Sequence, residues 1–460
     1  MRWAGVILAA GRGTRMNSRL PKLLHPLAGR PMAQWVLQAL REAGVKRVVA
    51  VVPSGEERIR EAFGPSVQFV EQAEPRGTGH ALLEAEGLLK DLEGGILVLP
   101  GDAPLVQAAT LKRLMDHHSR SKAAVTVLTA RGVPVEGLGR VVRRRDGTVG
   151  AIVEEHEADE AQRAIPEVNS SVYALRSGDV WPLLKGLTPS RKGEIYLTDL
   201  IGRVVANGGE VRALEAEDPW EAFGVNSRAQ LARAESVLRG RICEGWMEKG
   251  VTILQPATTF IDATASLGQD TVVYPNCHIY GNTTIGRECR IGPNAVVIDS
   301  KIGDRCRVLG SVLEGSALED DVAVGPFSHL RAETHVEAGV HIGNFVEIKK
   351  SRLKRGVKVA HFSYLGDAQV GENVNIGAGT ITCNFDGVRK WETVIEEGAF
   401  IGSDTMLVAP VKVGARAKTG AGSVVTKDIE PDTLAVGVPA RAIKKLRKAS
   451  DGHGLPDSQR

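Results

Sequence analysis

Residues suited to binding phosphate groups lie within the first quarter of the chain. The apolar run 6–10 ends in a loop, residues 11–16, that contains two glycines, and Lys22 follows it. Backbone N–H groups of such a loop can bind an anion, and a lysine at this distance can reach the same phosphates. Asp102 follows a second apolar run, 96–99. Because a triphosphate needs Mg²⁺ held by one or two oxygen ligands, we expect Asp102 to bind this metal.

Each of these signals also has a simpler interpretation. Loop 11–16 lacks the third glycine of a dinucleotide-binding fingerprint, so a plain tight turn explains it as well as an anion site does. An aspartate directly after a strand is most often a turn former. The coincidence of the loop, Lys22 and Asp102 is what favours metal-assisted phosphate binding.

The apolar pattern around these residues predicts the fold that positions them. Helices are expected at 32–43 and 57–63 and strands at 48–52 and 67–70, which is the alternation of a doubly wound α/β sheet. Residues 72–80 then follow a strand, on the edge where such sheets bind ligands. Further polar segments that could complete a sugar site at this edge lie around Gly139, Glu154, Asn169 and residues 193–199.

The second half of the chain has a different pattern, with an aliphatic residue at every sixth position. The first run of it is Leu267, Val273, Ile279, Ile285, Ile291 and Val297. A helix would repeat at 3.6 residues and a strand at 2, so a period of six indicates a repeat fold. Three hexads make one triangular coil of a parallel β-helix, with the aliphatic side chains inside. From 251 to 437 the pattern predicts about ten coils, a prism on the order of 48 Å long at ~4.8 Å per coil.

One polar segment, residues 383–394, interrupts the period before it resumes at Ile395. We interpret this segment as a loop carried by a rigid scaffold, which is a common place for functional residues.

A chain of 460 residues is too long for one ordinary core. We predict an α/β domain at 1–226, a linker helix at 227–250 that begins after the N-cap Ser227, a β-helix domain at 251–440 and a flexible tail at 441–460.

Composition excludes several classes of function. The net charge is only +3, and the short basic tract 441–448 fits a solvated end, so no nucleic-acid partner is expected. The five cysteines show no CxxC or Cys/His metal spacing, which is typical of free thiols in a reducing cytoplasm. No signal-peptide pattern and no apolar run near eighteen residues is present, so we expect a soluble cytoplasmic protein without membrane association.

Longer strings allow a comparison with known families. Residues 8–16, LAAGRGTRM, with Pro21-Lys22 resemble the signature loop of sugar-1-phosphate nucleotidyltransferases. The strings 344–350 (NFVEIKK), 361–367 (HFSYLGD) and 375–387 (NIGAGTITCNFDG) resemble the bacterial bifunctional N-acetylglucosamine-1-phosphate uridyltransferase/glucosamine-1-phosphate acetyltransferase family. The resemblance runs in order over residues 6–437.

This resemblance implies a Rossmann-like N-terminal domain and a left-handed parallel β-helix, a handedness that the period alone does not give. It implies that the C-terminal domain acetylates glucosamine-1-phosphate from acetyl-CoA. The N-terminal domain would then transfer UMP from UTP to N-acetylglucosamine-1-phosphate, releasing pyrophosphate. The product, UDP-N-acetylglucosamine, supplies cell-wall peptidoglycan and lipopolysaccharide synthesis.

Carried over residue by residue, the resemblance implies two sites. The first binds UTP through Leu8, Ala9, Ala10, Gly11, Lys22, Gln72, Gly77 and Thr78, holds Mg²⁺ with Asp102 and Asn226, and binds the acetylated sugar with Gly139, Glu154 and Asn169. The second uses His361 as general base, with Arg331, Lys349, Tyr364, Asn375, Asn384, Phe385 and Lys390 around glucosamine-1-phosphate and Ala378, Ser403, Ala421 and Arg441 toward acetyl-CoA. The family places this second site between subunits, which implies a homotrimer.

Three departures from the family pattern stand out. Ser171 follows Asn169-Ser170 where the family usually has Asn-Thr-Gly, and Phe385 stands where tyrosine is common. Residues 437–441, GVPAR, resemble the generic ending of other hexapeptide acyltransferases.

Two alternatives remain open at this point. The β-helix could be an inert oligomerisation scaffold behind an active nucleotidyltransferase, or the whole chain could be a non-catalytic regulatory subunit. The presence of His361 with Lys349 and Lys390 argues against the first alternative. The presence of Lys22, Asp102 and Asn226 argues against the second.

Overall fold

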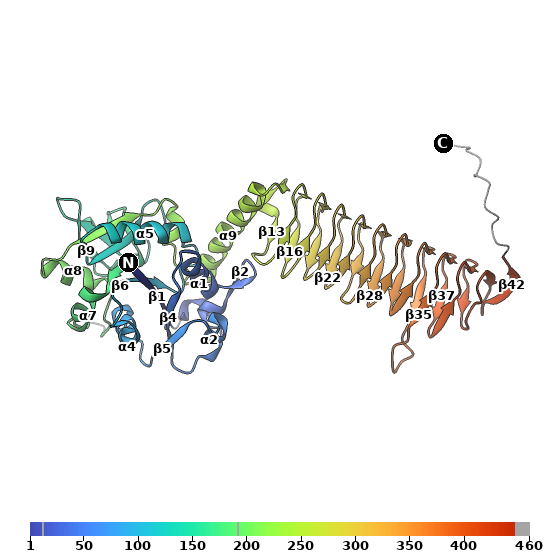
Figure 1. Cartoon of the computed structure of the whole chain (residues 1–460), viewed down its shortest axis with the longest axis horizontal. Helices are drawn as coiled ribbons and strands as arrows, with labels where there is room; N and C mark the ends of the chain where they lie inside the picture. The colour runs from blue at the N-terminus through green and yellow to red at the C-terminus, as the bar shows by residue number, and fades with distance from the viewer. Residues whose placement is uncertain (12, 191–192, 447–460) are drawn as a thin grey trace. The chain divides into compact units, whose positions relative to one another are not determined.

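The computed structural model describes residues 1–11, 13–190 and 193–446. It divides into two compact units, Met1–Leu238 and Arg239–Arg460, and each is described by itself (Figure 1). A single helix, α9 (Arg228–Glu248), occupies the segment predicted to link two domains. The division between the units therefore falls inside this helix.

The first unit is built around one nine-stranded sheet with the central order β11-β7-β10-β6-β1-β4-β5. Its strands are β1 (Arg2–Leu8), β4 (Arg47–Pro53), β5 (Gln68–Gln72), β6 (Gly94–Pro100), β7 (Val125–Ala130), β10 (Val168–Arg176) and β11 (Val211–Glu215), with the hairpin β8 (Arg140–Arg143) and β9 (Val149–Val153) joined to β10. Strands β1, β4, β5 and β6 are parallel to their neighbours in this group, as the α/β pattern predicts. Strand β10 is antiparallel to both β6 and β7, a reversal that the pattern did not predict.

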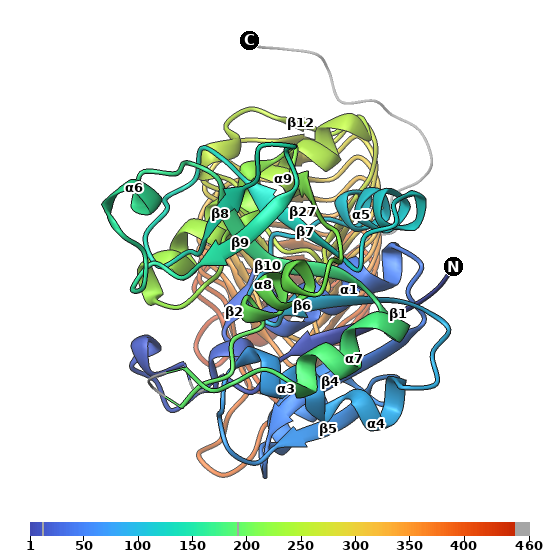
Figure 2. The ribbon, with the colours of Figure 1, turned by 90° about the vertical axis from the view of Figure 1, so that its left-hand side faces the viewer.

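Helices cover both faces of this sheet, as Figure 2 shows for α1 and α5 on one side and α3 and α7 on the other. Their bounds are α1 (Met32–Glu42), α2 (Glu57–Phe63), α3 (Thr78–Glu84), α4 (Glu86–Leu89), α5 (Ala108–Arg120), α6 (Glu160–Arg163), α7 (Ser177–Lys185) and α8 (Asp199–Ala206). The predicted helices 32–43 and 57–63 are confirmed. Because the central strands are buried on both faces, they are almost wholly apolar, and their carboxyl ends at Leu8, Gln72 and Pro100 lie on one edge.

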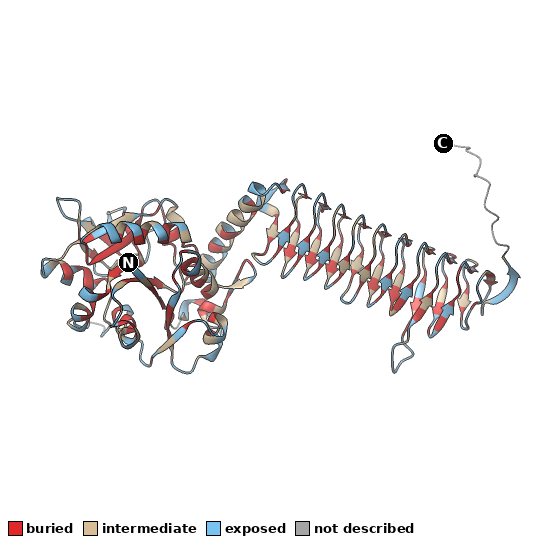
Figure 3. Cartoon of the chain, in the orientation of Figure 1, coloured by how far each residue is buried: buried red, intermediate tan, exposed pale blue. Residues whose placement is uncertain are grey.

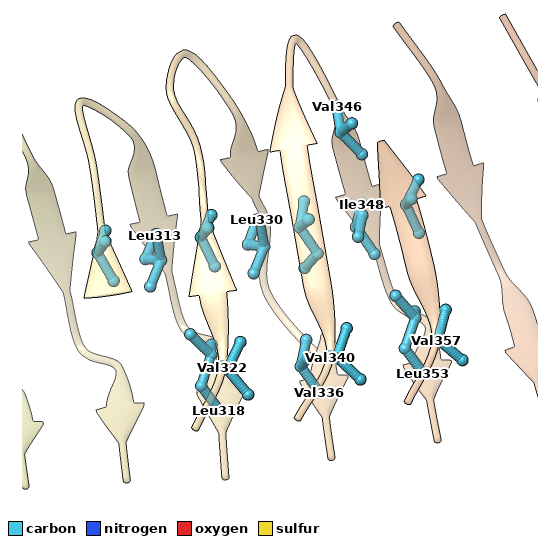
Figure 4. Close-up of a cluster of buried hydrophobic side chains, with 14 of the residues drawn as sticks. Leu313, Leu318, Val322, Leu330, Val336, Val340, Val346, Ile348, Leu353 and Val357 are labelled. Atoms are coloured by element: carbon cyan, nitrogen blue, oxygen red, sulfur yellow. The ribbon is translucent and has the colours of Figure 1, made fainter. Parts of the chain in front are cut away.

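The second unit is a parallel β-helix of short strands stacked in three sheets of 12, 10 and 9 strands. The register carries the sequence period directly, because Val272 of β15 (Val272–Val273) pairs with Arg290 of β18 (Arg290–Ile291), three hexads further on. The aliphatic residues of the hexads face inward and stack coil upon coil, as Figure 4 shows for Leu313, Leu330 and Ile348. In most of the short strands a buried position alternates with a more exposed one (Figure 3). The predicted hexad fold is confirmed.

Two details near the C-terminal end of the β-helix concern function. Strands β34 (Ile381–Cys383) and β35 (Thr393–Ile395) are joined by the predicted loop, which projects from the stack near β35 in Figure 1. The prediction of a flexible tail from residue 441 is wrong for its first part. Residues Arg441–Lys445 form β42, antiparallel to β41 (Thr433–Val436), because the last coil offers this segment a free strand edge. Residues 447–460 of the predicted tail lie outside the described residues.

Within the described residues, none of the helices combines the length and the apolar character needed to cross a membrane.

Candidate active sites

A pocket of about 710 Å³ opens at the carboxyl ends of the central strands in the first unit. Its wall contains most of the residues predicted for the first site, namely Leu8, Ala9, Ala10, Gly11, Lys22, Gln72, Gly77, Thr78, Asp102, Glu154 and Asn226. These residues come from segments more than two hundred positions apart. The α/β fold brings them together because the loops after β1, β5 and β6 share one sheet edge.

The centre of this pocket is a lysine held between two oxygen-bearing side chains. Lys22 Nζ forms an ion pair with Asp102 Oδ2 and donates to Asn226 Oδ1 at 3.0 Å. The backbone fixes these partners, since Val225 N donates to Asp102 O at 2.9 Å and so aligns the segment that carries Asn226. On the other side, Gly13 has φ 61°, and a Cβ there would lie 2.6 Å from Lys22 Cβ, so this position needs glycine.

The donor set of this cluster fits a magnesium ion. Asp102 and Asn226 supply a carboxylate and an amide oxygen, which are ligands that Mg²⁺ prefers, and both already hold a cationic group. Among the described residues, no group of three or more His, Cys, Asp or Glu side chains is arranged to hold a metal. A metal at Asp102 and Asn226 would therefore depend on further oxygens from bound phosphates and water, which is the usual situation for Mg²⁺ in phosphoryl transfer.

A second part of the pocket is formed by the loop between β5 and α3. Gln72 is 5% exposed, and its Nε2 donates to Gly77 O at 3.1 Å. Gly77 has φ 96°, and a Cβ there would lie 2.5 Å from Ile195 O, so any side chain would push the loop away from its neighbour. Leu197 N donates to Thr78 Oγ1 at 3.0 Å, which closes the segment after residue 193 over this loop.

Three residues, Glu154, Asn169 and Gly139, were predicted to bind the sugar. Of these, Glu154 lines the cavity. It accepts from Thr198 Oγ1 at 2.9 Å, and burial raises the pKa of its carboxyl. Asn169 is 3% exposed and lies behind the wall, where its Nδ2 donates to Tyr173 OH at 2.8 Å. Gly139 is also outside the lining, and its carbonyl accepts from Asn169 N at 2.9 Å.

The unusual Ser171 keeps the backbone conformation that glycine would adopt. Its φ is 60°, in the left-handed region, and its N–H donates to Asn169 Oδ1 at 3.0 Å. A serine there costs about 1 kcal/mol of strain relative to glycine. The departure from the family pattern therefore changes local energy rather than local geometry.

Several lining residues were indicated by the sequence only as parts of a segment. Thr14 and Arg15 lie in loop 11–16, and Glu194, Tyr196 and Thr198 lie in segment 193–199. Tyr173 also lines the pocket and was not named from the sequence. Burial and the Glu194 carboxylate raise the pKa of Tyr196 to about 12.

The second candidate site is an open arrangement on the surface of the β-helix. His361 ends β30 (Lys358–His361) and pairs in register with Asn344, the last residue of β27 (His341–Asn344). Its Nδ1 lies 2.5 Å from Asn344 Oδ1. Because an amide oxygen only accepts, the ring proton sits on Nδ1 and the lone pair on Nε2. An exposed imidazole oriented in this way can act as a base.

Four predicted residues lie on successive coils between His361 and the C-terminal end of the β-helix. We call this set the histidine column: His361, Ala378, Ser403 and Ala421. Gly379 N donates to His361 O at 3.4 Å, Asp404 N to Ala378 O at 2.6 Å and Gly422 N to Ser403 O at 2.8 Å. The column therefore follows one edge of the stacked coils. Arg441 begins β42, and its guanidinium donates to Ala440 O at 3.0 Å rather than to a member of the column.

Positive side chains gather where β28 (Glu347–Lys349) ends, one strand further along the coil than the Asn344 and His361 pair, and we call Arg331, Lys349 and Lys390 the cationic cluster. The neighbouring Lys390 ammonium, and then Arg331, lower the pKa of Lys349. Arg331 Nη1 is 2.9 Å from Glu347 Oε1, so Arg331 is partly neutralised. Lys390 reaches Lys349 from the projecting loop, where its backbone forms an isolated antiparallel β-bridge with that of Phe385. A cluster with mutually repelling cations favours a bound anion.

The remaining predicted residues lie on several neighbouring coils. Tyr364 of β31 (Tyr364–Gly366) lies next to Glu347 in register, and Asn375 of β33 (Asn375–Ile376) lies next to Lys358. Asn384 is 6% exposed, and its Nδ2 donates to Asp367 Oδ2 at 2.6 Å, which fixes the amide. Phe385 is 59% exposed at the base of the loop.

The two units thus combine a phosphate-binding α/β domain with a hexad-repeat β-helix. The family model of the MobA-like NTP transferase domain matches residues 5–176, and that of the bacterial transferase hexapeptide (six repeats) matches 264–299 and 392–427. These matches define a nucleotidyltransferase domain followed by a transferase domain with the left-handed β-helix of hexapeptide proteins.

Similar proteins share this arrangement over their whole length. The chain is 47% identical over 441 residues to the bifunctional protein GlmU of Heliobacterium modesticaldum, covering 96% of each chain. It is 45% identical over 441 residues to that of Geobacillus thermodenitrificans, again covering 96% of each. For the protein of Trichlorobacter lovleyi the identity is 47% over 456 residues, covering 98% of this chain and 99% of the relative. The chain belongs to the GlmU family of bifunctional enzymes.

Proposed function

We propose that the chain carries out two consecutive steps of UDP-N-acetylglucosamine synthesis, acetyl transfer on the β-helix and uridyl transfer in the α/β unit. The supporting observation is that both polar clusters, Lys22 with Asp102 and Asn226, and His361 with the cationic cluster, occur in one chain that matches bifunctional relatives over 96% of its length. A chain with an inert β-helix would not need the second cluster, and a regulatory subunit would need neither.

In the first site, catalysis requires mainly positioning and charge neutralisation. An oxygen of the sugar phosphate attacks the α-phosphorus of UTP, and pyrophosphate leaves. Lys22 and the N–H groups of the glycine loop bind the triphosphate, while Asp102 and Asn226 hold Mg²⁺, which would neutralise phosphate charge. Arg15 lines the same pocket and adds a second cation for the phosphates.

Base and sugar recognition follow from the rest of the pocket wall. Gln72 and the backbone around Gly77 and Thr78 face the uracil end. Glu154 accepts from the sugar hydroxyls, and Asn169 acts from behind the wall by holding Tyr173 and Ser171 in place.

In the second site, His361 takes a proton from the amine of glucosamine-1-phosphate. The Nδ1 hydrogen bond to Asn344 leaves Nε2 free to accept that proton, so the neutral amine can attack the thioester of acetyl-CoA. The cationic cluster binds the sugar phosphate, and Asn384, held by Asp367, orients the amine. Acetyl-CoA would extend along Ala378, Ser403 and Ala421. Arg441 has the weakest support as a contact, since it does not join this column.

The exposure of this site supports a homotrimer as the active form. His361 and Lys390 are exposed on the single chain, so one chain alone does not enclose the reacting groups. A second copy against this face would exclude water. We also place the protein in the cytoplasm, where its five cysteines would stay reduced.

Two assays on the same preparation test this function. Release of CoA with glucosamine-1-phosphate and acetyl-CoA measures the second site, and release of pyrophosphate with UTP and N-acetylglucosamine-1-phosphate measures the first. Both should be present. Pyrophosphate release without CoA release would support the inert-scaffold alternative, and neither activity would support the regulatory subunit.

A further inference from the structure

The side-chain amide of Gln72 has both of its hydrogens engaged by the protein. Nε2 donates to Gly77 O at 3.1 Å and lies 3.0 Å from His80 Nδ1. Among the described residues no donor contacts Oε1, and Gln72 is part of the pocket wall. The oxygen of this amide is therefore the polar atom left to face a ligand.

The orientation of this amide depends on which nitrogen of His80 carries the ring proton. His80 is in helix α3, and its Nε2 lies 3.4 Å from Glu84 Oε1, one turn further along. The negative carboxylate beside Nε2 favours the proton on that nitrogen, and Nδ1 then keeps its lone pair for the amide hydrogen of Gln72. Glu84, His80 and Gln72 thus form a directed series of polar contacts that ends at the pocket wall.

A flipped amide would be penalised by this arrangement. It would place Oε1 against two acceptors, Gly77 O and His80 Nδ1, and would leave both of those acceptors without a donor. An unpaired polar group in a buried site costs roughly a factor of ten or more in equilibrium. Because Gln72 is 5% exposed, water cannot easily replace the lost partners.

We propose that His80 is a positioning residue that selects uracil over cytosine by fixing the amide of Gln72. The N3 position of uracil is a hydrogen-bond donor and matches an amide that presents its oxygen. The N3 position of cytosine is an acceptor and matches an amide that presents its NH₂ group. This inference rests on the proposed uridyl transfer, and it adds the group that decides which pyrimidine the pocket accepts.

Two substitutions of His80 separate this role from a general effect on helix α3. His80→Asn places an amide oxygen near the position of Nδ1, so it can still accept from Gln72. His80→Gln places its oxygen near the position of Nε2 and removes the acceptor next to Gln72. Both variants are polar and compatible with a helix, and they differ mainly in where the acceptor lies.

The test measures kcat/KM for pyrophosphate release with UTP and with CTP, using N-acetylglucosamine-1-phosphate as acceptor. We expect His80→Gln to lower the UTP to CTP ratio by ~10-fold, the effect of one hydrogen bond in a buried site, and His80→Asn to stay within ~3-fold of the parent. CoA release normalises the amount of chain, and the thermal unfolding of each variant, compared with the parent, checks folding of the α/β unit.

The outcomes distinguish this inference from the proposed function. A parent enzyme that releases no pyrophosphate from UTP would overturn the proposed function itself. A parent that uses UTP, with equal UTP to CTP ratios in the parent and both variants, would overturn the role of His80 while leaving the function intact. Equal loss of the ratio in both variants would also overturn it, since the position of the acceptor would then not matter.

Discussion

The pocket of the first unit and the histidine column of the second differ in how far one chain encloses the chemistry. Lys22 is 9% exposed and Asp102 18%, and both line a cavity of about 710 Å³. His361, in contrast, is exposed on the outside of a stacked prism. An α/β sheet encloses a ligand with its own loops, whereas a β-helix has no interior space for one, because aliphatic side chains fill it. This difference is the reason for the proposal that the second site needs another surface and the first does not.

The largest expected effect separates the two regions through the base of the second site. His361→Ala should lower acetyl transfer by ~10²–10⁴-fold at neutral pH, because the protonated amine then has no positioned acceptor for its proton. Glucosamine-1-phosphate should still bind, since the cationic cluster is untouched. Initial rates of CoA release measure the loss, and pyrophosphate release should be unchanged. A variant that acetylates within a few-fold of the parent would show that another group is the base.

The reciprocal change concerns the proposed metal ligand of the first site. Asp102→Ala removes the carboxylate that would hold Mg²⁺ and should lower pyrophosphate release by ~10²–10³-fold, the usual scale for one lost electrostatic group. CoA release should stay at the parent level. In a titration with Mg²⁺, the variant should need a higher Mg²⁺ concentration for half-maximal activity than the parent. Equal loss of both activities would mean that the two regions are not separate sites.

A smaller effect is expected for Lys390→Ala, which tests the proposed binding of phosphate by the cationic cluster. Lys390→Ala removes the ammonium that lowers the pKa of Lys349, so that pKa should rise toward its ordinary value. Loss of one cation should raise KM for glucosamine-1-phosphate by ~10-fold with little change in kcat, since phosphate binding is used equally before and during the reaction. NMR titration of Lys349 follows the pKa, and an unchanged value would show that the two ammonium groups do not interact.

The pattern of these residues explains how much could be predicted from the sequence. The β-helix was predicted almost completely, because each coil repeats one steric requirement, a buried aliphatic such as Val273 or Ile279 every sixth residue. The α/β alternation was predicted from the apolar pattern of residues 32–70. The reversal of β10 was not, since the order of residues in a strand does not encode its direction and its partners are set by tertiary packing.

For the sites, the predictable residues were those inside long motifs. Lys22, Asp102 and Asn226 converge as the resemblance implies, while Tyr173 lines the pocket without any local pattern that marks it. Asn169 is 3% exposed, a depth that the sequence does not encode, and the contacts of Gly139 and Asn169 with the sugar stay predictions. Strand β42 formed because the last coil has a free edge, which is a property of the fold and not of residues 441–445.

Burial makes a pH prediction possible for the wall of the first pocket. Since the folded pKa of Glu154 is raised by burial, this group contributes stability that is fully present below its unfolded pKa and is lost as pH rises through the folded pKa. Glu154→Gln keeps the hydrogen bond from Thr198 without a charge. The variant should therefore gain Tm relative to the parent at pH 8 and lose that advantage at pH 4. A difference in Tm that does not vary with pH would contradict this assignment.

The smallest expected effect concerns the strained turn in the same wall. Ser171→Gly should stabilise the chain by roughly 0.5–1 kcal/mol, because glycine adopts a positive φ without strain. Ser170→Gly is the matched control and should destabilise, since Ser170 Oγ donates to Leu128 O at 2.7 Å. Urea denaturation measures both. A loss of stability in Ser171→Gly would show that its side chain has a role that outweighs the strain.

The central claim, that one site is complete within a chain and the other requires an assembly, is tested most directly by active-enzyme sedimentation. In this measurement, a band of dilute enzyme sediments through substrate, and the mass of the catalysing species is read from the moving front of product. The account predicts that CoA release travels with a species of about three times the chain mass of 49.1 kDa. CoA release that travels with a 49.1 kDa monomer would contradict it.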